Sequence, residues 1–382
     1  MNPLADALVA PLANRPETVL IGADGTEITG VALFELSGQI ANVLTNAGIK
    51  PGDRVAMQTE KSVTALALYL ACLRAGALFL PLNTAYTAAE LDYFLGDAEP
   101  KVVVCDPKAQ ETLTPMAAAK GIALLTLDAS DNGTLSDLAA TSSTTFTTAN
   151  RGNDDLAAIL YTSGTTGRSK GAMLSHDNLL SNADSLVEAW QFTSDDTLLH
   201  ALPIFHAHGL FVATNVLLRA NGRMIFLPRF NLDTVIAMLP KATAMMGVPT
   251  FYTRLLSDAR FTPDLTLHMR LFISGSAPLL AETHVEFETR TGHRILERYG
   301  MTETTMSTSN PYAGERRAGT VGLPLPRVEA RIVDAETGES LPQGDTGILE
   351  VRGPNVFKGY WLVDFLIFFV PFMYGFLQGL VG

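Results

Sequence analysis

Apolar strand-like runs alternate with helix-like stretches along most of the chain. The run Lys101–Cys105 (KVVVC) is continuous and β-branched, as expected of a strand in a parallel sheet that is covered on both faces. The helical pattern over 34–48 closes on Gly48, and the one over 62–74 is ended by Gly76; glycine is a typical helix stop. Strands that alternate with helices predict an α/β fold built from crossover units.

A Ser/Thr-rich stretch, 141–150 (TSSTTFTTAN), interrupts this alternation. We interpret it as a surface loop and predict a sub-domain junction near 141–155. The alternation then resumes. The final part differs, because 328–352 places Gly-containing turns between strand-like runs, which predicts antiparallel structure within a β-rich end of about 320–361. We therefore expect one large domain over residues 1–361.

The composition narrows the class of protein. With 382 residues, 47% of them hydrophobic, the chain can fill large cores, which favours a multi-lobed enzyme over a disordered protein or a small binding module. Its formal net charge of −12 argues against a nucleic-acid partner, because phosphate binding needs concentrated Lys and Arg. Two cysteines, Cys72 and Cys105, are too few for a disulfide framework, so a reduced, cytoplasmic compartment is expected.

The two ends of the chain carry different signals. Residues 1–14 contain no Lys or Arg, so no secretory signal peptide is expected. Residues 362–382 are mostly apolar, with Asp364 the one formal charge, and could just cross a bilayer. Three accounts of this tail stay open: a truncated or frame-shifted reading frame, a buried core helix, or a membrane anchor with Arg352 and Lys358 on its cytoplasmic side.

The segment Tyr161–Gly171 (YTSGTTGRSKG) is rich in glycine and hydroxyls, follows a strand-like run and precedes a helix that starts near Ser175. Glycines let backbone N–H groups converge on an anion, hydroxyls add neutral donors, and Lys170 supplies the charge. These features indicate triphosphate binding, with a flexible turn as the plain alternative. A Walker loop is excluded, because two residues rather than four separate Gly164 and Gly167.

This segment resembles the phosphate loop of the acyl-adenylate-forming enzymes, the superfamily of acyl-CoA synthetases and luciferases. Further matches occur in the family's order: Leu70–Gly76 with Pro81–Asn83 upstream, and Leu202–Gly209 (LPIFHAHG), Gly275–Pro278 (GSAP) and Glu297–Glu303 (ERYGMTE) downstream. The resemblance covers residues from about 15 to 361 and looks most like malonyl-CoA synthetases. It implies the large N-terminal domain of the family, with two αβ-layered sheet sub-domains and a β-rich end.

The resemblance implies ATP-dependent activation of a carboxylic acid through an acyl-AMP, followed by transfer to CoA, with Mg²⁺ as the metal. Because two negatively charged reactants meet, cations and amide donors should supply much of the barrier reduction. The implied ATP-binding residues are Thr162, Ser163, Gly164, Thr165, Thr166, Gly167, Lys170, Gly275, Ser276, Ala277, Pro278, Tyr299, Gly300 and Thr302. The implied catalytic residues are His206, Thr302 and Glu303; Glu303 is also the metal ligand, and His206, Arg298 and Met301 bind the acid.

Arg298 bears on the identity of the acid. A buried guanidinium that faces an alkyl tail is costly, whereas a dicarboxylate supplies a counter-charge in planar geometry. We therefore expect malonate, or methylmalonate, as substrate. The alternative is that Arg298 pairs with a protein carboxylate such as Glu297 or Glu288. A metal site at His206 and His208 is a further alternative, but it lacks obvious third and fourth ligands.

The resemblance ends at Gly359-Tyr360-Trp361. Family members continue with a Thr-Gly-Asp segment, a hinge and a small C-terminal domain that carries a second catalytic lysine, and none of these follows here. We therefore expect impaired thioester formation. Two rival functions stay open: a ligase for another short or aromatic acid, and a non-catalytic nucleotide-binding remnant that contacts a membrane only through 362–382.

Overall fold

The structure is a computed structural model that describes residues 1–162 and 168–362. One sheet contains β3 (Arg54–Gln58), β4 (Leu78–Pro81), β5 (Val102–Cys105), β6 (Ala123–Thr126), β7 (Leu156–Thr162) and β8 (Lys170–Ser175). A second contains β1 (Thr18–Ile21), β2 (Glu27–Thr29), β9 (Thr197–His200), β10 (Arg223–Phe226), β11 (Ala244–Gly247), β12 (Leu271–Ser274), β13 (Leu296–Tyr299), β14 (Thr308–Ser309) and β15 (Leu323–Pro324). A ribbon pairs β16 (Glu329–Val333) with β17 (Ile348–Arg352).

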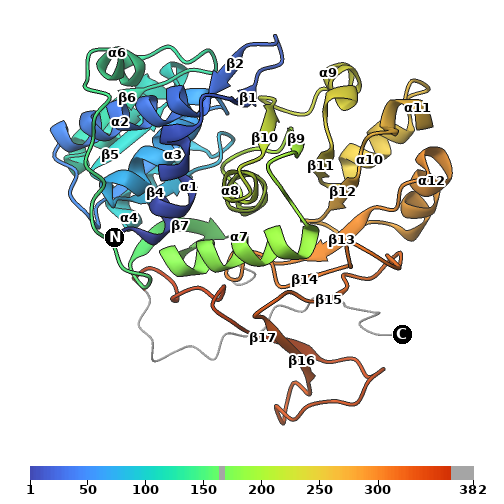
Figure 1. Ribbon diagram of the computed structural model, residues 1–382. Helices are drawn as coiled ribbons and strands as arrows, with labels where there is room; N and C mark the ends of the chain where they lie inside the picture. The colour runs from blue at the N-terminus through green and yellow to red at the C-terminus, as the bar shows by residue number, and fades with distance from the viewer. Residues whose placement is uncertain (163–167, 363–382) are drawn as a thin grey trace.

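The helices that accompany these sheets are α1 (Pro3–Leu8), α2 (Gly30–Asn46), α3 (Val63–Ala75), α4 (Ala88–Ala98), α5 (Gln110–Lys120), α6 (Thr134–Ala140), α7 (His176–Trp190), α8 (Asn215–Arg219), α9 (Leu232–Met238), α10 (Pro249–Leu256), α11 (Pro263–Thr266) and α12 (Ala281–Thr291). Shorter helical segments are η1 (Ala10–Asn14), η2 (Pro107–Ala109), η3 (His208–Thr214) and η4 (Leu239–Lys241). The sheets and helices form a layered body, and the ribbon projects from it (Figure 1). This arrangement confirms the predicted α/β fold class.

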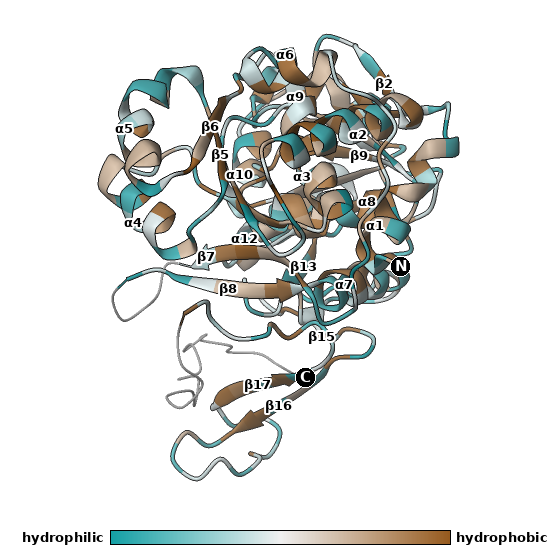
Figure 2. Cartoon of the chain, turned by 90° about the vertical axis from the view of Figure 1, so that its left-hand side faces the viewer, coloured by the Kyte–Doolittle hydropathy of each residue, from teal (hydrophilic) through white to brown (hydrophobic). Residues whose placement is uncertain are grey.

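Both sheets are mainly parallel. The first runs in the order β6-β5-β3-β4-β7-β8, and the second in the order β15-β14-β13-β12-β11-β9-β10-β1-β2. The predicted strand at Lys101–Cys105 is confirmed as β5, whose four residues are all buried. Figure 2 shows β5 as a hydrophobic strand, which is the composition expected of a strand covered on both faces.

Local sequence signals explain the ends of α3. Ser62 Oγ accepts a hydrogen bond from the N–H of Ala65 at 3.2 Å, and Gly76 ends the helix with φ of 70°, a conformation that favours glycine. Residues 64–75 are all buried. A helix that is apolar on every side must lie inside the protein, and the largest hydrophobic cluster accordingly joins α3 to residues of both sheets.

The predicted junction near 141–155 does not coincide with the division between the sheets. Strands β7 and β8 follow it, yet β7 pairs with β4 of the first sheet. Strand β1 precedes it, yet pairs in parallel with β10 of the second. Part of segment 141–155 lies against α3, where the side chain of Arg74 donates to the carbonyl of Phe146 at 2.9 Å. The sub-domain boundary stays a prediction.

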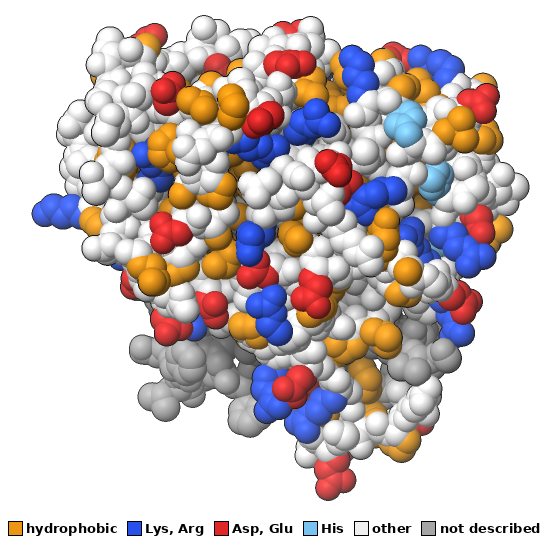
Figure 3. Space-filling view, in the orientation of Figure 1, with side chains coloured by type: hydrophobic (Ala, Val, Ile, Leu, Met, Phe, Trp, Pro, Cys, Tyr) orange, Lys and Arg blue, Asp and Glu red, His pale blue; other side chains and the backbone are white. Residues whose placement is uncertain are grey.

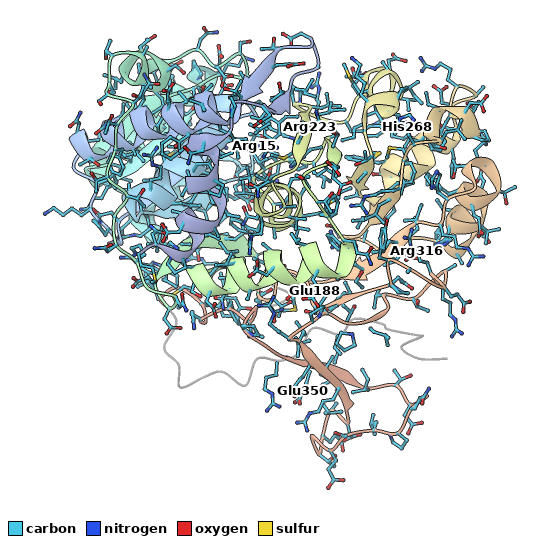
Figure 4. All side chains as sticks on the ribbon, viewed as in Figure 1. Arg15, Glu188, Arg223, His268, Arg316 and Glu350 are labelled. Atoms are coloured by element: carbon cyan, nitrogen blue, oxygen red, sulfur yellow. The ribbon has the colours of Figure 1, made fainter. Side chains whose placement is uncertain are left out.

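The predicted antiparallel structure in 328–352 is confirmed by the ribbon of β16 and β17. Ion pairs join its strands: Arg331 Nε lies 2.6 Å from Glu350 Oε2, and Arg352 pairs with Glu329. Figure 3 shows cationic and anionic side chains interspersed over this face of the molecule. In Figure 4, Glu350 marks the ribbon, and Arg316 marks the segment between β14 and β15.

In residues 1–162 and 168–362, no helix combines the length and the apolar character needed to cross a bilayer. The predicted hydrophobic tail lies, beyond Leu362, outside the described residues.

Candidate active site

Three of the predicted motifs follow strands of one parallel set. In the second sheet β9 pairs in parallel with β11, β11 with β12, and β12 with β13. The carboxyl ends of parallel strands meet at one edge of the sheet, where open α/β proteins bind ligands. The segments after β9, β12 and β13, which are 201–209, 275–278 and 300–303, therefore come together at that edge.

The glycine-rich segment lies between the antiparallel strands β7 and β8. Thr162 and Lys170 are paired in register across these strands. The predicted residues Ser163, Gly164, Thr165, Thr166 and Gly167 lie outside the described residues. After β8, Ser175 caps α7 by accepting from the N–H of Asn178. The sequence pattern predicted this helix but not β8.

Glu303, Tyr360 and Lys170 come together although they are far apart in sequence. Glu303 is buried, with 5% of its surface exposed. The Tyr360 hydroxyl donates to Glu303 Oε1 at 2.7 Å, and the N–H of Phe357 donates to the Glu303 carbonyl at 2.8 Å. The Lys170 ammonium lies 5.3 Å from the centre of the Tyr360 ring. The segment after β17 thus holds both the side chain and the backbone of Glu303, and one tyrosine contacts both a carboxylate and a cation.

A buried lysine holds the segment after β9. Lys61, just before α3, donates from Nζ to His200 Nδ1 at 2.8 Å and to the carbonyls of His200 and Leu202 at 2.7 and 3.1 Å. His200 Nε2 lies 2.9 Å from the carbonyl of Gly209. Because that carbonyl only accepts, Nε2 carries the proton and Nδ1 accepts from Lys61. We call Lys61, His200 and these carbonyls the lysine clamp.

The lysine clamp uses every hydrogen of the Lys61 ammonium, and the ammonium also lies 4.1 Å from the centre of the Phe226 ring. Burial lowers the pKa of Lys61 well below its ordinary value, while three acceptors and an aromatic face stabilise the charged form. The clamp spans the segment from His200 to Gly209, and so fixes the backbone on which His206 and His208 stand.

Arg298, on β13, lies against the backbone of Gly275. A Cβ at Gly275 would fall 2.3 Å from Arg298 Cζ, so a glycine is required for this close approach. Arg298 is 4% exposed, and its Nε and Nη2 atoms are buried without a hydrogen-bond partner in the described part of the chain. Burial lowers the pKa of Arg298 to about 9, which leaves it a cation at neutral pH.

The two protein carboxylates considered as partners for Arg298 have other neighbours. Glu288 pairs with Arg294 at 2.7 Å. Glu297 accepts from the N–H of Gly319 at 3.3 Å and lies 3.4 Å from His284 Nδ1. Across residues 1–162 and 168–362, Arg298 forms no ion pair with a carboxylate, so the structure does not support the protein-pair alternative.

His208, the first residue of η3, is buried and lies beside this cation. Its Nδ1 atom is 3.2 Å from Ser276 Oγ, and its Nε2 atom is buried without a partner among the described residues. Ser276 has φ of 68°, an uncommon conformation for a residue other than glycine. Burial first, and then the charge of Arg298, hold the pKa of His208 well below its ordinary value, so the ring is neutral.

The other predicted residues lie around this edge at different depths. Tyr299, Gly300, Met301 and Thr302 are half-buried, whereas His206, Ala277 and Pro278 are exposed. A Cβ at Gly300 would fall 1.9 Å from the Thr305 carbonyl, so glycine is needed for the tight turn after β13. The ring of His206 lies 4.7 Å from that of Phe205. The described residues of the predicted site therefore lie around one edge of the second sheet. Their individual roles stay predictions.

Three residues of this neighbourhood were not among the predicted site residues: Lys61, His208 and Tyr360. A lysine before a helix or a tyrosine after a strand carries no local signal of a buried contact, so the sequence could not single out Lys61 or Tyr360. His208 was considered as a metal ligand. In the described part of the chain, no group of three or more His, Cys, Asp or Glu side chains is arranged to hold a metal ion.

Comparison with known proteins agrees with this geometry. The model of the AMP-binding enzyme family matches residues 9–361. The chain belongs to the AMP-binding enzyme family. The chain is 34% identical over 346 residues to the malonate–CoA ligase of Arabidopsis thaliana, an alignment of 85% of the chain. It is 32% identical to a feruloyl-CoA synthase of Amycolatopsis over 91% of the chain and 69% of the relative.

Among solved structures, ATP-bound MatB from Rhodopseudomonas palustris is 59% identical to this chain, with a TM-score of 0.93 over 95% of the chain and 72% of MatB. The likeness confirms the fold of the large domain. The chain spans only 56% of the length of the Arabidopsis ligase, so the comparison covers the AMP-binding part and not the whole of that relative.

Proposed function

We propose that this AMP-binding enzyme uses ATP to convert malonate, or methylmalonate, into its acyl-AMP, for transfer to CoA. The observation that carries the proposal is the buried guanidinium of Arg298, whose Nε and Nη2 atoms have no partner among the described residues. An uncompensated buried charge is costly, and the distal carboxylate of a short dicarboxylic acid supplies both the counter-charge and the planar acceptor geometry. Similarity to a malonate–CoA ligase and to MatB supports this choice.

The nucleotide would bind near the facing ends of β7 and β8 and the turn after β13. Thr162 and Lys170 stand at the two described ends of the glycine-rich segment, and the existence of ATP-bound MatB supports a nucleotide there. Lys170 would neutralise the polyphosphate. Gly275 to Pro278 would line the adenine side, with Tyr299 against the base, and Thr302 would contact the α-phosphate. Each of these roles rests on the family resemblance and on placement at the common edge.

Glu303 suits a magnesium ion. Mg²⁺ is commonly held by one or two carboxylates together with phosphate oxygens and water. Glu303 offers one carboxylate, buried and oriented by the Tyr360 hydroxyl, beside the half-buried Thr302. This donor set fits the ion. When bound, Mg²⁺ would supply charge neutralisation at the phosphates; Glu303 would hold it, and Tyr360 would orient Glu303.

In this site the protein would act by positioning and charge compensation. Arg298 would hold the distal carboxylate, so that the other carboxylate points toward the α-phosphate near His206 and Thr302. A carboxylate oxygen then bonds to the α-phosphorus, and the bond from that phosphorus to pyrophosphate breaks. Lys170 and the amides of the glycine-rich segment would stabilise the departing pyrophosphate, which is where negative charge gathers.

Acid-dependent exchange of labelled pyrophosphate into ATP tests the proposal, because it reports adenylation without CoA. We expect malonate and methylmalonate to stimulate exchange, and acetate, benzoate and ferulate to stimulate it far less. Greater stimulation by ferulate or benzoate would assign the protein to aromatic acids instead, an alternative that the feruloyl-CoA synthase similarity favours. ATP binding without exchange for any acid would contradict the catalytic role.

A further inference from the structure

We propose that His208 is a specificity-determining residue that donates a second hydrogen bond to the carboxylate held by Arg298, and that Ser276 sets the tautomer which makes this possible. The inference rests on the proposed function and adds to it the means by which the site distinguishes a carboxylate from its neutral analogues.

The placement of His208 is the first support. It is 5% exposed, so its ring lies inside the protein. Nε2 has no hydrogen-bond partner among the described residues, and the same is true of Nε and Nη2 of Arg298. Native proteins pair nearly all of their buried polar atoms. Unpartnered nitrogens on two neighbouring side chains therefore indicate one ligand group that engages both.

The protonation of the ring is the second support. Arg298, His200 and His206 face His208 from β13, β9 and the segment after β9, and all three disfavour a further positive charge. A neutral imidazole has one N–H and one acceptor nitrogen. Where the Ser276 hydroxyl donates to Nδ1, the proton resides on Nε2. That nitrogen is then a donor beside the donors of Arg298.

The lysine clamp contributes a fixed backbone. Gly209, whose carbonyl lies 2.9 Å from His200 Nε2, is the residue directly after His208. On the other side, Gly275 packs against Arg298 and directly precedes Ser276, so adjacent residues of one turn contact Arg298 and His208. The relative positions of His208 and Arg298 are thus fixed by two packed segments rather than by the side chains alone.

Two neighbouring side chains that present only donors select a group that only accepts. An ionised carboxylate is such a group, whereas a terminal amide places its own N–H hydrogens against His208 and Arg298, and a methyl group leaves the donors unpaired. Sites built to hydrogen-bond a substrate group reject analogues that lack it by large factors, up to about 10⁴-fold or more. Malonate and its half-amide, malonamate, have nearly the same shape and differ in this property.

The test compares malonate with malonamate in pyrophosphate exchange by the wild type, His208→Leu and His208→Gln. Leucine removes the donor, whereas the glutamine amide can place an N–H near the position of Nε2. We expect His208→Leu to lose about 10- to 100-fold in kcat/KM for malonate, the range of one hydrogen bond to a charged group, with little change for malonamate. We expect His208→Gln to recover much of the malonate activity.

His268→Gln is the matched control. His268 is exposed and lies just before β12, at the opposite end of that strand from the site, as its label in Figure 4 shows. The substitution should leave both substrates unaffected. Ser276→Ala should raise the malonate KM by about 3- to 10-fold, the value of one neutral hydrogen bond; its ATP KM reports separately on the adenine role proposed for Ser276.

The outcomes separate the two proposals. If malonate does not stimulate exchange by the wild type, and does not bind in a calorimetric titration with ATP present, the proposed function fails. If malonate stimulates exchange by the wild type but His208→Leu loses malonate and malonamate activity equally, or loses neither, only the role of His208 is overturned. Calorimetric titration of malonate into the same variants gives a readout that requires no turnover.

Discussion

Two buried cations in this protein have opposite surroundings. Lys61, in the lysine clamp, places all three of its hydrogens on acceptors. Arg298, in the cluster it forms with Gly275, Ser276 and His208, leaves two nitrogens without a partner in the described part of the chain. Each is less than 5% exposed, and burial lowers the pKa of each. They differ in the partners that the described residues supply: Lys61 has three acceptors, whereas two nitrogens of Arg298 have none.

The difference separates a structural cation from a binding cation. A buried charge whose hydrogen bonds are satisfied holds parts of the fold together, and its removal leaves its partners unsatisfied. A buried charge without a hydrogen-bond partner destabilises the folded protein. Such a charge is expected where a bound ligand supplies the missing partner. Lys61 should therefore matter first for stability and Arg298 first for substrate binding, and the following variants test this division.

The largest effect is expected at Arg298. Arg298→Met should lower malonate-dependent kcat/KM by about 100- to 1000-fold, since loss of one partner of a buried charge pair costs about 2–5 kcal/mol. Its free energy of unfolding, from urea titration, should be unchanged or higher, because an uncompensated buried charge is removed. Arg294→Met, at an exposed arginine paired with Glu288, is the control. An unchanged malonate KM in Arg298→Met would remove Arg298 from the proposed site.

Gly275 offers a second route to the same cluster. A methyl group there would meet Arg298 Cζ at 2.3 Å, so Gly275→Ala should displace the guanidinium and lose about 30- to 100-fold in malonate kcat/KM, within the range for a misplaced charge partner. Gly96→Ala is the control, because its nearest neighbour is the end of the flexible Lys120 side chain at 3.6 Å. Equal activity of the two variants would contradict the close contact.

Lys61 should show the reverse pattern. Lys61→Met leaves the His200 ring and the Leu202 carbonyl without their donor, while the His200 carbonyl keeps the N–H of Leu227. We expect it to lower the free energy of unfolding by about 3 kcal/mol. Urea unfolding monitored by circular dichroism measures this, with the exposed Lys241→Met as control. Full stability in Lys61→Met would show that the lysine clamp does not stabilise the fold, and would place Lys61 with Arg298 as a group retained for function.

His176 tests the structural side of the comparison by pH. Burial lowers its pKa to about 4, so the unfolded chain takes up a proton on this ring below about pH 6.5 while the folded protein does not. His176 therefore makes its full contribution to the free energy of unfolding above that pH. The contribution is lost as the pH falls toward the pKa of the ring in the folded protein. At about 1.4 kcal/mol per pKa unit the complete loss, below the folded pKa, is about 3–4 kcal/mol.

Urea unfolding of the wild type and His176→Gln at about pH 7 and about pH 4.5, on either side of most of this titration, measures the contribution. The variant should lose less stability on acidification than the wild type. If both lose the same amount, His176 does not contribute, and its buried Nδ1 atom is protonated in the folded protein without cost.

The smallest effect is expected at Tyr360. Tyr360→Phe removes the hydroxyl that donates to Glu303 but leaves the ring in place. A hydrogen bond to a charged group is worth about 1.5–3 kcal/mol, and part of this should appear as about a 3- to 5-fold rise in the Mg²⁺ concentration for half-maximal exchange. Binding of Mn²⁺, followed by electron paramagnetic resonance, gives a readout independent of activity. An unchanged metal affinity would show that Tyr360 does not orient Glu303.

The amino-acid sequence determined the elements of the fold and the order of its motifs. The β-branched run of β5, the serine cap and glycine stop of α3, and the turn-rich pattern of β16 and β17 are local signals, and each was confirmed because neighbours in sequence decide them. The strand β8 was missed because the glycines before it mark a loop without saying what the loop connects.

Only the tertiary structure decided which groups are buried and how they are paired. Lys61 meets His200 across 139 positions, Glu303 meets Tyr360 across 57, and β1 joins a sheet most of whose strands come much later in the chain. The positions of Glu297 and Glu288 in the sequence did not show whether either carboxylate pairs with Arg298. The energy of a buried charge depends on every donor and acceptor that the fold brings to it, and sequence spacing carries none of that information.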